Sequence, residues 1–84
     1  MDNDLLLYVN NLLHALGMPS NIKGFQYITC AILMVYEDPN LIGQITKKLY
    51  PYISLKYNTS AAGVERNIRH SIDISWLRGD LNLI

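Results

Sequence analysis

The sequence predicts an all-α protein, a small helical bundle that contains a helix-turn-helix. Apolar residues recur at three- and four-residue steps, no stretch alternates as a strand does, and turn-forming residues separate four segments. Half of the 84 residues are hydrophobic and 17% are charged, which indicates a folded globule rather than a disordered chain. Because a domain typically holds about 100–150 residues, we expect residues 1–84 to form a single domain.

The first two segments are expected to form helices over residues 3–16 and 22–37. The apolar positions of the first segment follow helical spacing: Leu5, Val9, Leu12, Leu13 and Leu16. Gly17 favours the left-handed conformation that ends a helix. The second segment is apolar over most of its circumference, which predicts a central helix. Asn21 is its expected N-cap, and Pro39 lies just beyond its end.

The third segment covers residues 41–57 and is interrupted by Pro51. We therefore expect a short helix before Leu49 and a second helix over residues 50–57. Five tyrosines at helical steps are expected in the core or at its rim, rather than as a stacking surface for single-stranded bases: Tyr27, Tyr36, Tyr50, Tyr52 and Tyr57.

The fourth helix is expected over residues 60–78, with Thr59 or Ser60 as its N-cap. At about 100° per residue, one narrow stripe of this helix faces the core. That stripe comprises Ala61, Val64, Ile68, Ile72 and Ser75. The opposite arc is polar and is expected to point outward: Glu65, Arg66, Arg69, His70 and Asp73.

The net charge is zero, but the charges are unevenly distributed along the chain. Residues 1–43 hold four acidic side chains and one lysine, whereas residues 44–70 hold five basic side chains and one glutamate. The second region therefore carries a net charge of +4. A basic segment on an acidic scaffold indicates contact with nucleic acid.

Several other functions are disfavoured by the sequence. Cys30 is the single cysteine and the two histidines are distant, so we expect no disulfide within the chain, no metal site and no cofactor. The carboxylates are dispersed and the glycines isolated, so we expect no enzyme activity and no small-molecule substrate. The longest apolar run, residues 27–36, is half of the roughly 20 residues that span a membrane. The start is acidic, unlike a signal peptide, and we expect a cytoplasmic protein without membrane contact.

Residues 50–72 follow the layout of a helix-turn-helix. The small side chain of Ser54 allows two helices to cross closely, and Asn58 with Thr59 favours a tight turn between them. The helix that follows, over about residues 60–78, is then expected to enter the major groove of double-stranded DNA as the recognition helix.

Four side chains of this helix are expected to read bases. Arg66 and Arg69 can each donate paired hydrogen bonds to guanine, Glu65 can accept from cytosine, and His70 can donate to a base or a phosphate. Contacts to the DNA backbone are expected from Lys47, Lys48, Lys56, Thr59 and Ser60. From the residues alone, an ordinary solvated helix face with a Glu65–Arg69 pair remains an alternative.

The segment from Ile45 to Gly79 reads ITKKLYPYISLKYNTSAAGVERNIRHSIDISWLRG and resembles the C-terminal effector domain of the stage-zero sporulation response regulators. The upstream stretches NIKGFQYITCAILMVYEDPNLIG and LLHALGMP are also similar to that family. The VERNIRH block is the most specific of these motifs. The resemblance implies an all-helical domain that binds short DNA boxes related to TGTCGAA. It also implies that Glu65, Arg66, Arg69 and His70 lie on the recognition helix.

Three differences from the family pattern bear on function. We expect no receiver domain to act within residues 1–84, and the sequence ends at Ile84, where the family domain continues with helices that contribute to contacts between protomers. Gly63 stands where relatives often carry a long polar residue. We therefore expect a sequence-specific transcriptional regulator, with a homodimer possible. The alternative is a protein-interaction module that antagonises a full-length regulator, which an exposed apolar patch over residues 76–84 would favour.

Overall fold

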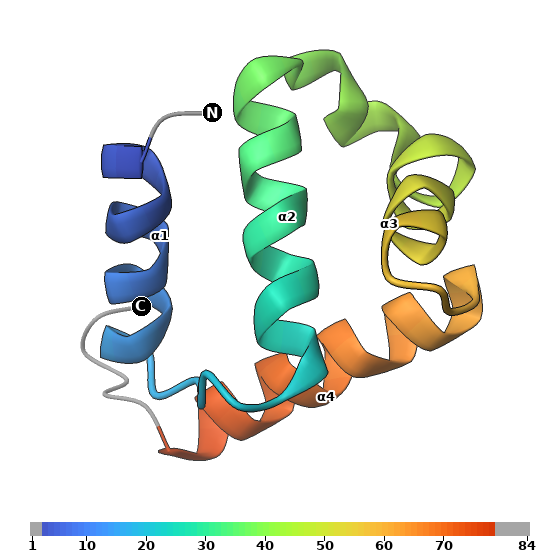
Figure 1. The fold of residues 1–84 in the computed structure, drawn as a ribbon. Helices are drawn as coiled ribbons and strands as arrows, with labels where there is room; N and C mark the ends of the chain where they lie inside the picture. The colour runs from blue at the N-terminus through green and yellow to red at the C-terminus, as the bar shows by residue number, and fades with distance from the viewer. Residues whose placement is uncertain (1–2, 79–84) are drawn as a thin grey trace.

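The computed structural model describes residues 3–78, which form an all-α bundle and contain no strand (Figure 1). Its α-helices are α1 (Asn3–Ala15), α2 (Lys23–Glu37), α3 (Tyr50–Lys56) and α4 (Ala61–Arg78). The helices α1 and α3 flank α2, and α4 runs beneath them (Figure 1). Because α2 packs against each of the other three, it is the central helix that the sequence predicts.

The end of α1 forms a Schellman motif around Gly17, which has a φ of 85°. The amide of Met18 donates to the carbonyl of Leu13 at 3.0 Å, and the amide of Gly17 donates to the carbonyl of His14 at 2.9 Å. Leu13 and Met18 are both buried in one core cluster, which supplies the hydrophobic contact typical of this motif. The predicted left-handed helix stop is confirmed.

The start of α2 differs from the prediction, because the N-cap is Ile22 and not Asn21. Ile22 has extended backbone angles and makes no side-chain capping bond. Asn21 therefore lies one position too early for its side chain to serve as the cap. The amide of Phe25 donates instead to the carbonyl of Ile22 at 3.2 Å.

The segment between α2 and α3 consists of two short helices, the first wound more tightly than an α-helix and the second more widely. A 3₁₀-helix, η1 (Pro39–Gln44), is followed by a π-helix, η2 (Ile45–Leu49), which runs directly into α3. The expected boundary at Leu49 is correct, although the sequence did not indicate these helix types. Pro51 has no amide to donate and its ring crowds the carbonyl four residues earlier, which fits a widened turn before it.

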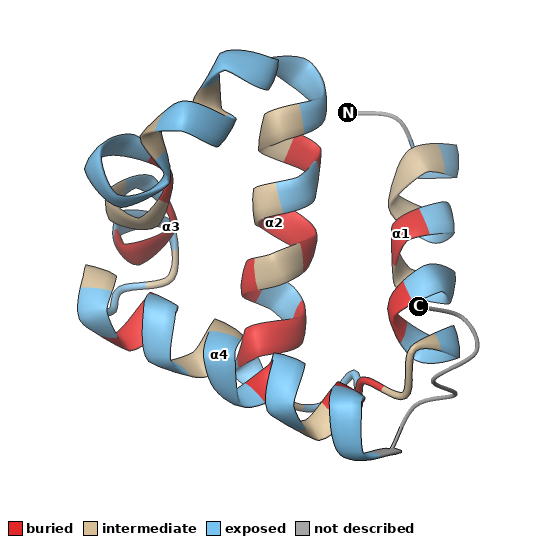
Figure 2. Cartoon of the chain, turned by 180° about the vertical axis from the view of Figure 1, so that it is seen from behind, coloured by how far each residue is buried: buried red, intermediate tan, exposed pale blue. Residues whose placement is uncertain are grey.

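The core comprises two clusters on either side of α2 (Figure 2). The first cluster lies around α1 and α2 and contains Val9, Leu13, Met18, Phe25 and Leu33. The second joins α2, η2, α3 and α4 and contains Tyr27, Cys30, Leu49, Ile53 and Val64. Four residues expected in the core or at its rim are instead exposed: Leu12, Tyr36, Tyr52 and Ile72.

The helices α2 and α4 approach each other closely at Gly24 and Ser71. A Cβ atom on Gly24 would lie 2.8 Å from the Cβ of Ser71 and would overlap both the Ser71 hydroxyl and the backbone carbonyl of Asn67. Ser71 is fully buried, whereas its neighbour Ile72 is 53% exposed. Small residues at the crossing thus turn the buried face of α4 away from Ile72, which explains why the predicted stripe is wrong at that position.

Candidate nucleic-acid interface

The turn between α3 and α4 is built around Asn58, whose φ of 53° lies in the left-handed region. Asparagine tolerates this conformation better than most residues. The amide of Thr59 donates to the carbonyl of Ser54 at 2.9 Å, which is the long-range bond of a Schellman motif. The helix-turn-helix expected from the sequence is therefore present. The amide of Thr59 donates within the turn and is not available to a phosphate.

The start of α4 is capped by Ser60. The Oγ atom of Ser60 accepts from the amide of Gly63 at 2.9 Å, and the Ser60 carbonyl accepts from the amide of Val64. A Cβ on Gly63 would lie 2.9 Å from the hydroxyl oxygen of Thr59, so glycine makes room for the capping side chains. Ser60 is thus the N-cap of α4, one of the two residues predicted for this role.

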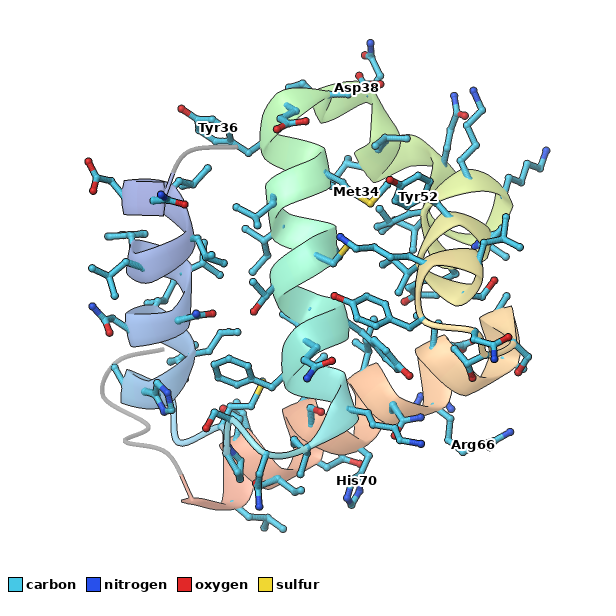
Figure 3. All side chains as sticks on the ribbon, viewed as in Figure 1. Met34, Tyr36, Asp38, Tyr52, Arg66 and His70 are labelled. Carbon is cyan, nitrogen blue, oxygen red and sulfur yellow. The ribbon has the colours of Figure 1, made fainter. Side chains whose placement is uncertain are left out.

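The outer side of α4 carries the four predicted base-reading side chains, and all four are exposed: Glu65, Arg66, Arg69 and His70. Figure 3 shows Arg66 and His70 pointing away from α2 on the outer side of α4. The opposite side of α4 is anchored by the buried Val64, Ser71 and Ser75. The hydroxyl of Ser75 also donates to the carbonyl of Leu16, which ties α4 to the end of α1.

Arg69 forms an ion pair with Glu65 one turn earlier, with 2.6 Å between Nη2 and Oε1. The two side chains are 70% and 48% exposed, respectively, so solvent screens the attraction. Pairs of this type contribute a few tenths of a kcal/mol, roughly 0.3–0.5. DNA can therefore replace Glu65 as the partner of Arg69 at small cost. The Arg66 guanidinium and the remaining donors of Arg69 are bonded to no described residue.

The predicted phosphate-binding groups come from three parts of the chain: η2, the end of α3 and the turn before α4. Lys47 and Lys48 are exposed on η2. Ile45 and Leu49 of that π-helix line an apolar cavity together with Ile68 of α4.

Lys56 lies elsewhere, at the edge of a second cavity beside α2, with its Nζ 5.7 Å from the ring centroid of Tyr57. At the start of α4, two groups that the sequence did not single out are the backbone amides of Ala61 and Ala62. Neither amide donates to a residue within 3–78, and they face outward at a helix N-terminus.

The apolar cavity between α1, α2, η2 and α4 has a volume of about 510 Å³. Ile72 and Trp76 form part of its lining and are 53% and 59% exposed. Of the segment over residues 76–84, in which an exposed apolar patch would favour a protein partner, Trp76 and Leu77 are exposed and residues 79–84 lie outside the described part of the chain.

Cys30 is buried beside Met34, with 3.8 Å between the two sulfur atoms. Burial raises the pKa of the Cys30 thiol, and the nearby Lys56 charge opposes this effect. Within residues 3–78, no cluster of three or more His, Cys, Asp or Glu side chains is arranged to bind a metal. Across the same range, each helix is too short or too polar to cross a bilayer.

An exposed polar arc that carries two arginines on the second helix of a helix-turn-helix is typical of helix-turn-helix DNA-binding domains. A protein-family comparison identifies the family within this class. The model described as sporulation initiation factor Spo0A C terminal matches residues 9–84, and the chain belongs to that family. It is therefore a DNA-binding effector domain of the sporulation-regulator type.

Proposed function

We propose that the chain binds double-stranded DNA sequence-specifically and regulates transcription in the control of sporulation. The recognition helix is α4, which enters the major groove with its outer side. The observation that carries this proposal is the separation of the two sides of α4. Arg66, Arg69 and His70 are exposed on one side, while Val64 and Ser71 are buried on the other.

Arg66 and Arg69 are the main base readers, with Glu65 and His70 in support. Each arginine matches the O6 and N7 acceptors of a guanine, and Glu65 can accept from the N4 amine of a cytosine once Arg69 has left it. The exposure of these side chains supports the assignment, since none has to leave the core to reach a base.

Phosphate contacts hold the domain in register on the duplex. Lys47, Lys48 and the hydroxyls of Thr59 and Ser60 contribute, and the free amides of Ala61 and Ala62 add donors where the helix dipole favours an anion. Lys56 remains a proposed backbone contact, although its ammonium group lies over Tyr57 in the free protein.

The test is a titration of the chain with a duplex carrying a TGTCGAA-type box and with a scrambled duplex, each at two salt concentrations. Sequence-specific binding predicts tighter binding to the box and a steep dependence on salt. Arg69→Ala and Arg66→Ala should each weaken binding to the box by about 1–3 kcal/mol and reduce the preference over the scrambled duplex.

The matched control is Lys23→Ala, which removes one positive charge from an exposed position on a different helix, at the start of α2. It should change the affinities for the two duplexes equally and slightly. If Arg69→Ala discriminates between the two duplexes as well as the unmodified chain does, Arg69 is not a base reader.

The exposed Ile72 and Trp76 at the apolar cavity favour a second candidate function. In this alternative, the chain binds a full-length sporulation regulator through that cavity and blocks its assembly. Mixing the two proteins without DNA should then give a complex in gel filtration that Trp76→Ala weakens. Elution of the two proteins as separate species would reject this alternative.

A further inference from the structure

A cavity of about 460 Å³ lies along α2, between residues of α1 and residues of α3. Ligand pockets in proteins have volumes of about 300–1,000 Å³ and are mostly apolar with a few polar groups. The floor of this cavity is apolar and comes from α2, with Phe25, Cys30, Leu33 and Met34. Figure 3 shows Met34 and Tyr52 near each other between α2 and α3.

A single cation, the ammonium group of Lys56, belongs to this cavity. It lies over the ring of Tyr57 and close enough to Cys30 to affect the pKa of the thiol. No carboxylate of residues 3–78 forms an ion pair with Lys56. A positive charge without a counter-charge therefore stands beside an apolar surface, and an anionic group placed there would gain a charge-assisted hydrogen bond.

We propose that this cavity binds an amphiphile with one anionic head and one unbranched apolar chain, of the class of the fatty acids. The carboxylate accepts from the Lys56 ammonium, and the hydrocarbon chain covers Cys30 and then Leu33 and Leu6. Cys30 and Leu33 are already buried in the free protein, so most of the affinity comes from removing the hydrocarbon chain of the ligand from water. Lys56 selects the charge of the head group.

The other charged residue of the cavity, Glu37, determines the direction in which the ligand lies. Glu37 is at the end of α2, seven residues after Cys30, which corresponds to about 10 Å along a helix. An anionic head is repelled from that end and held at Lys56. The apolar chain therefore extends across α2 towards α1, where Leu6 and Phe25 are its contacts.

Binding is tested with decanoate and with decanol, which has the same chain length and no charge, by NMR of the full chain without DNA. Decanoate should shift the methyl signal of Met34, which lines this cavity, and leave the indole signal of Trp76 unchanged, because Trp76 lines the other cavity. Lys56→Gln should weaken decanoate binding about tenfold and bring it close to that of decanol. Lys23→Gln, the matched control, removes an equal charge outside the cavity and should leave decanoate binding unchanged.

Equal affinities for decanoate and decanol, or an unaltered decanoate affinity in Lys56→Gln, would overturn the proposal. Shifts confined to Trp76 would instead place the hydrocarbon in the other cavity and also reject it. Since Lys56 is exposed, its substitution is not expected to unfold the chain, and circular dichroism of each variant confirms this. The measurement contains no DNA, so its outcome is independent of the proposed base contacts.

Discussion

Replacing Gly24 by alanine tests the packing that positions α4. The added Cβ would lie 2.8 Å from the Cβ of Ser71 and would overlap the backbone carbonyl of Asn67. Rotation of a side chain cannot relieve the contact with the carbonyl, so α2 and α4 have to separate. Overpacking of this kind costs about 1–3 kcal/mol.

The higher helix propensity of alanine returns at most about 1 kcal/mol of this loss. With a gross overpacking cost of about 3 kcal/mol, at the upper end of the range, we expect the free energy of unfolding of Gly24→Ala to fall by about 2 kcal/mol. For a chain of this length, that corresponds to a decrease in Tm of about 8–16 °C. Urea unfolding followed by circular dichroism measures the first quantity, and a thermal scan measures the second.

Gly43→Ala is the matched control, because no atom lies within 4 Å of a Cβ at that position. It should leave stability unchanged or raise it by about 0.4–1 kcal/mol through the unfolded state. In the double variant Gly24→Ala/Ser71→Ala, the Ser71 hydroxyl is gone but the Asn67 carbonyl remains, so only part of the loss should be recovered. Equal stability of Gly24→Ala and the unmodified chain would refute the close crossing of α2 and α4.

Three further outcomes are expected. Ser60→Ala should lower the free energy of unfolding by about 1 kcal/mol in urea, because the amide of Gly63 loses its acceptor. Asn58→Ala should cost about 1–2 kcal/mol in the same assay, whereas Asn58→Gly should be nearly neutral, since φ is 53° there. Burial raises the pKa of Cys30 above 9.0, so iodoacetamide should modify it slowly in the native protein at pH 8 and rapidly in urea, as followed by mass spectrometry. Because the folded protein favours the neutral thiol, Cys30 adds to the free energy of unfolding below pH 9.0, and this contribution is lost as the pH rises through the raised pKa of the native thiol. Cys30→Ala should remove this contribution to the pH dependence of stability.

The helices were predictable because each has a strong local signal. Apolar periodicity located α1, α2 and α4 to within one or two residues, and Gly17 and Ser60 marked two of the ends. The 3₁₀ and π turns between α2 and α3 were not predictable in the same way. Their geometry depends on how this segment connects α2 to α3 just before Pro51, and the apolar periodicity of the sequence does not indicate that connection.

The packing of α4 was only partly predictable. Angular position alone assigned Ile72 to the core and passed over Ser71, since a serine carries no hydrophobic signal. The decisive residue is Gly24, which lies far away in the sequence and permits the close approach. A contact between two small residues that are far apart in the sequence cannot be predicted from the apolar pattern of one helix.

The candidate site was also predictable only in part, because helical geometry sets the direction of a side chain on its own helix and does not show how the helices pack. The outward direction of Arg66, Arg69 and His70 follows from helical geometry and agrees with their exposure in the structure. The location of Lys56 at a cavity beside α2 does not follow from its place in the sequence, because it depends on how α3 packs. The free amides of Ala61 and Ala62 carry no side-chain signal at all.

The division of α4 into an anchored side and a solvent side allows the two to be altered separately. Exposed positions such as Arg66 and His70 hold no part of the core, so other side chains can be substituted there with little penalty to folding. Under the proposed function, exchanging a few of these surface residues would change the preferred DNA sequence and keep the fold. Ser71 lacks this freedom, since it is fully buried against Gly24 and a larger side chain there would push α4 away from α2.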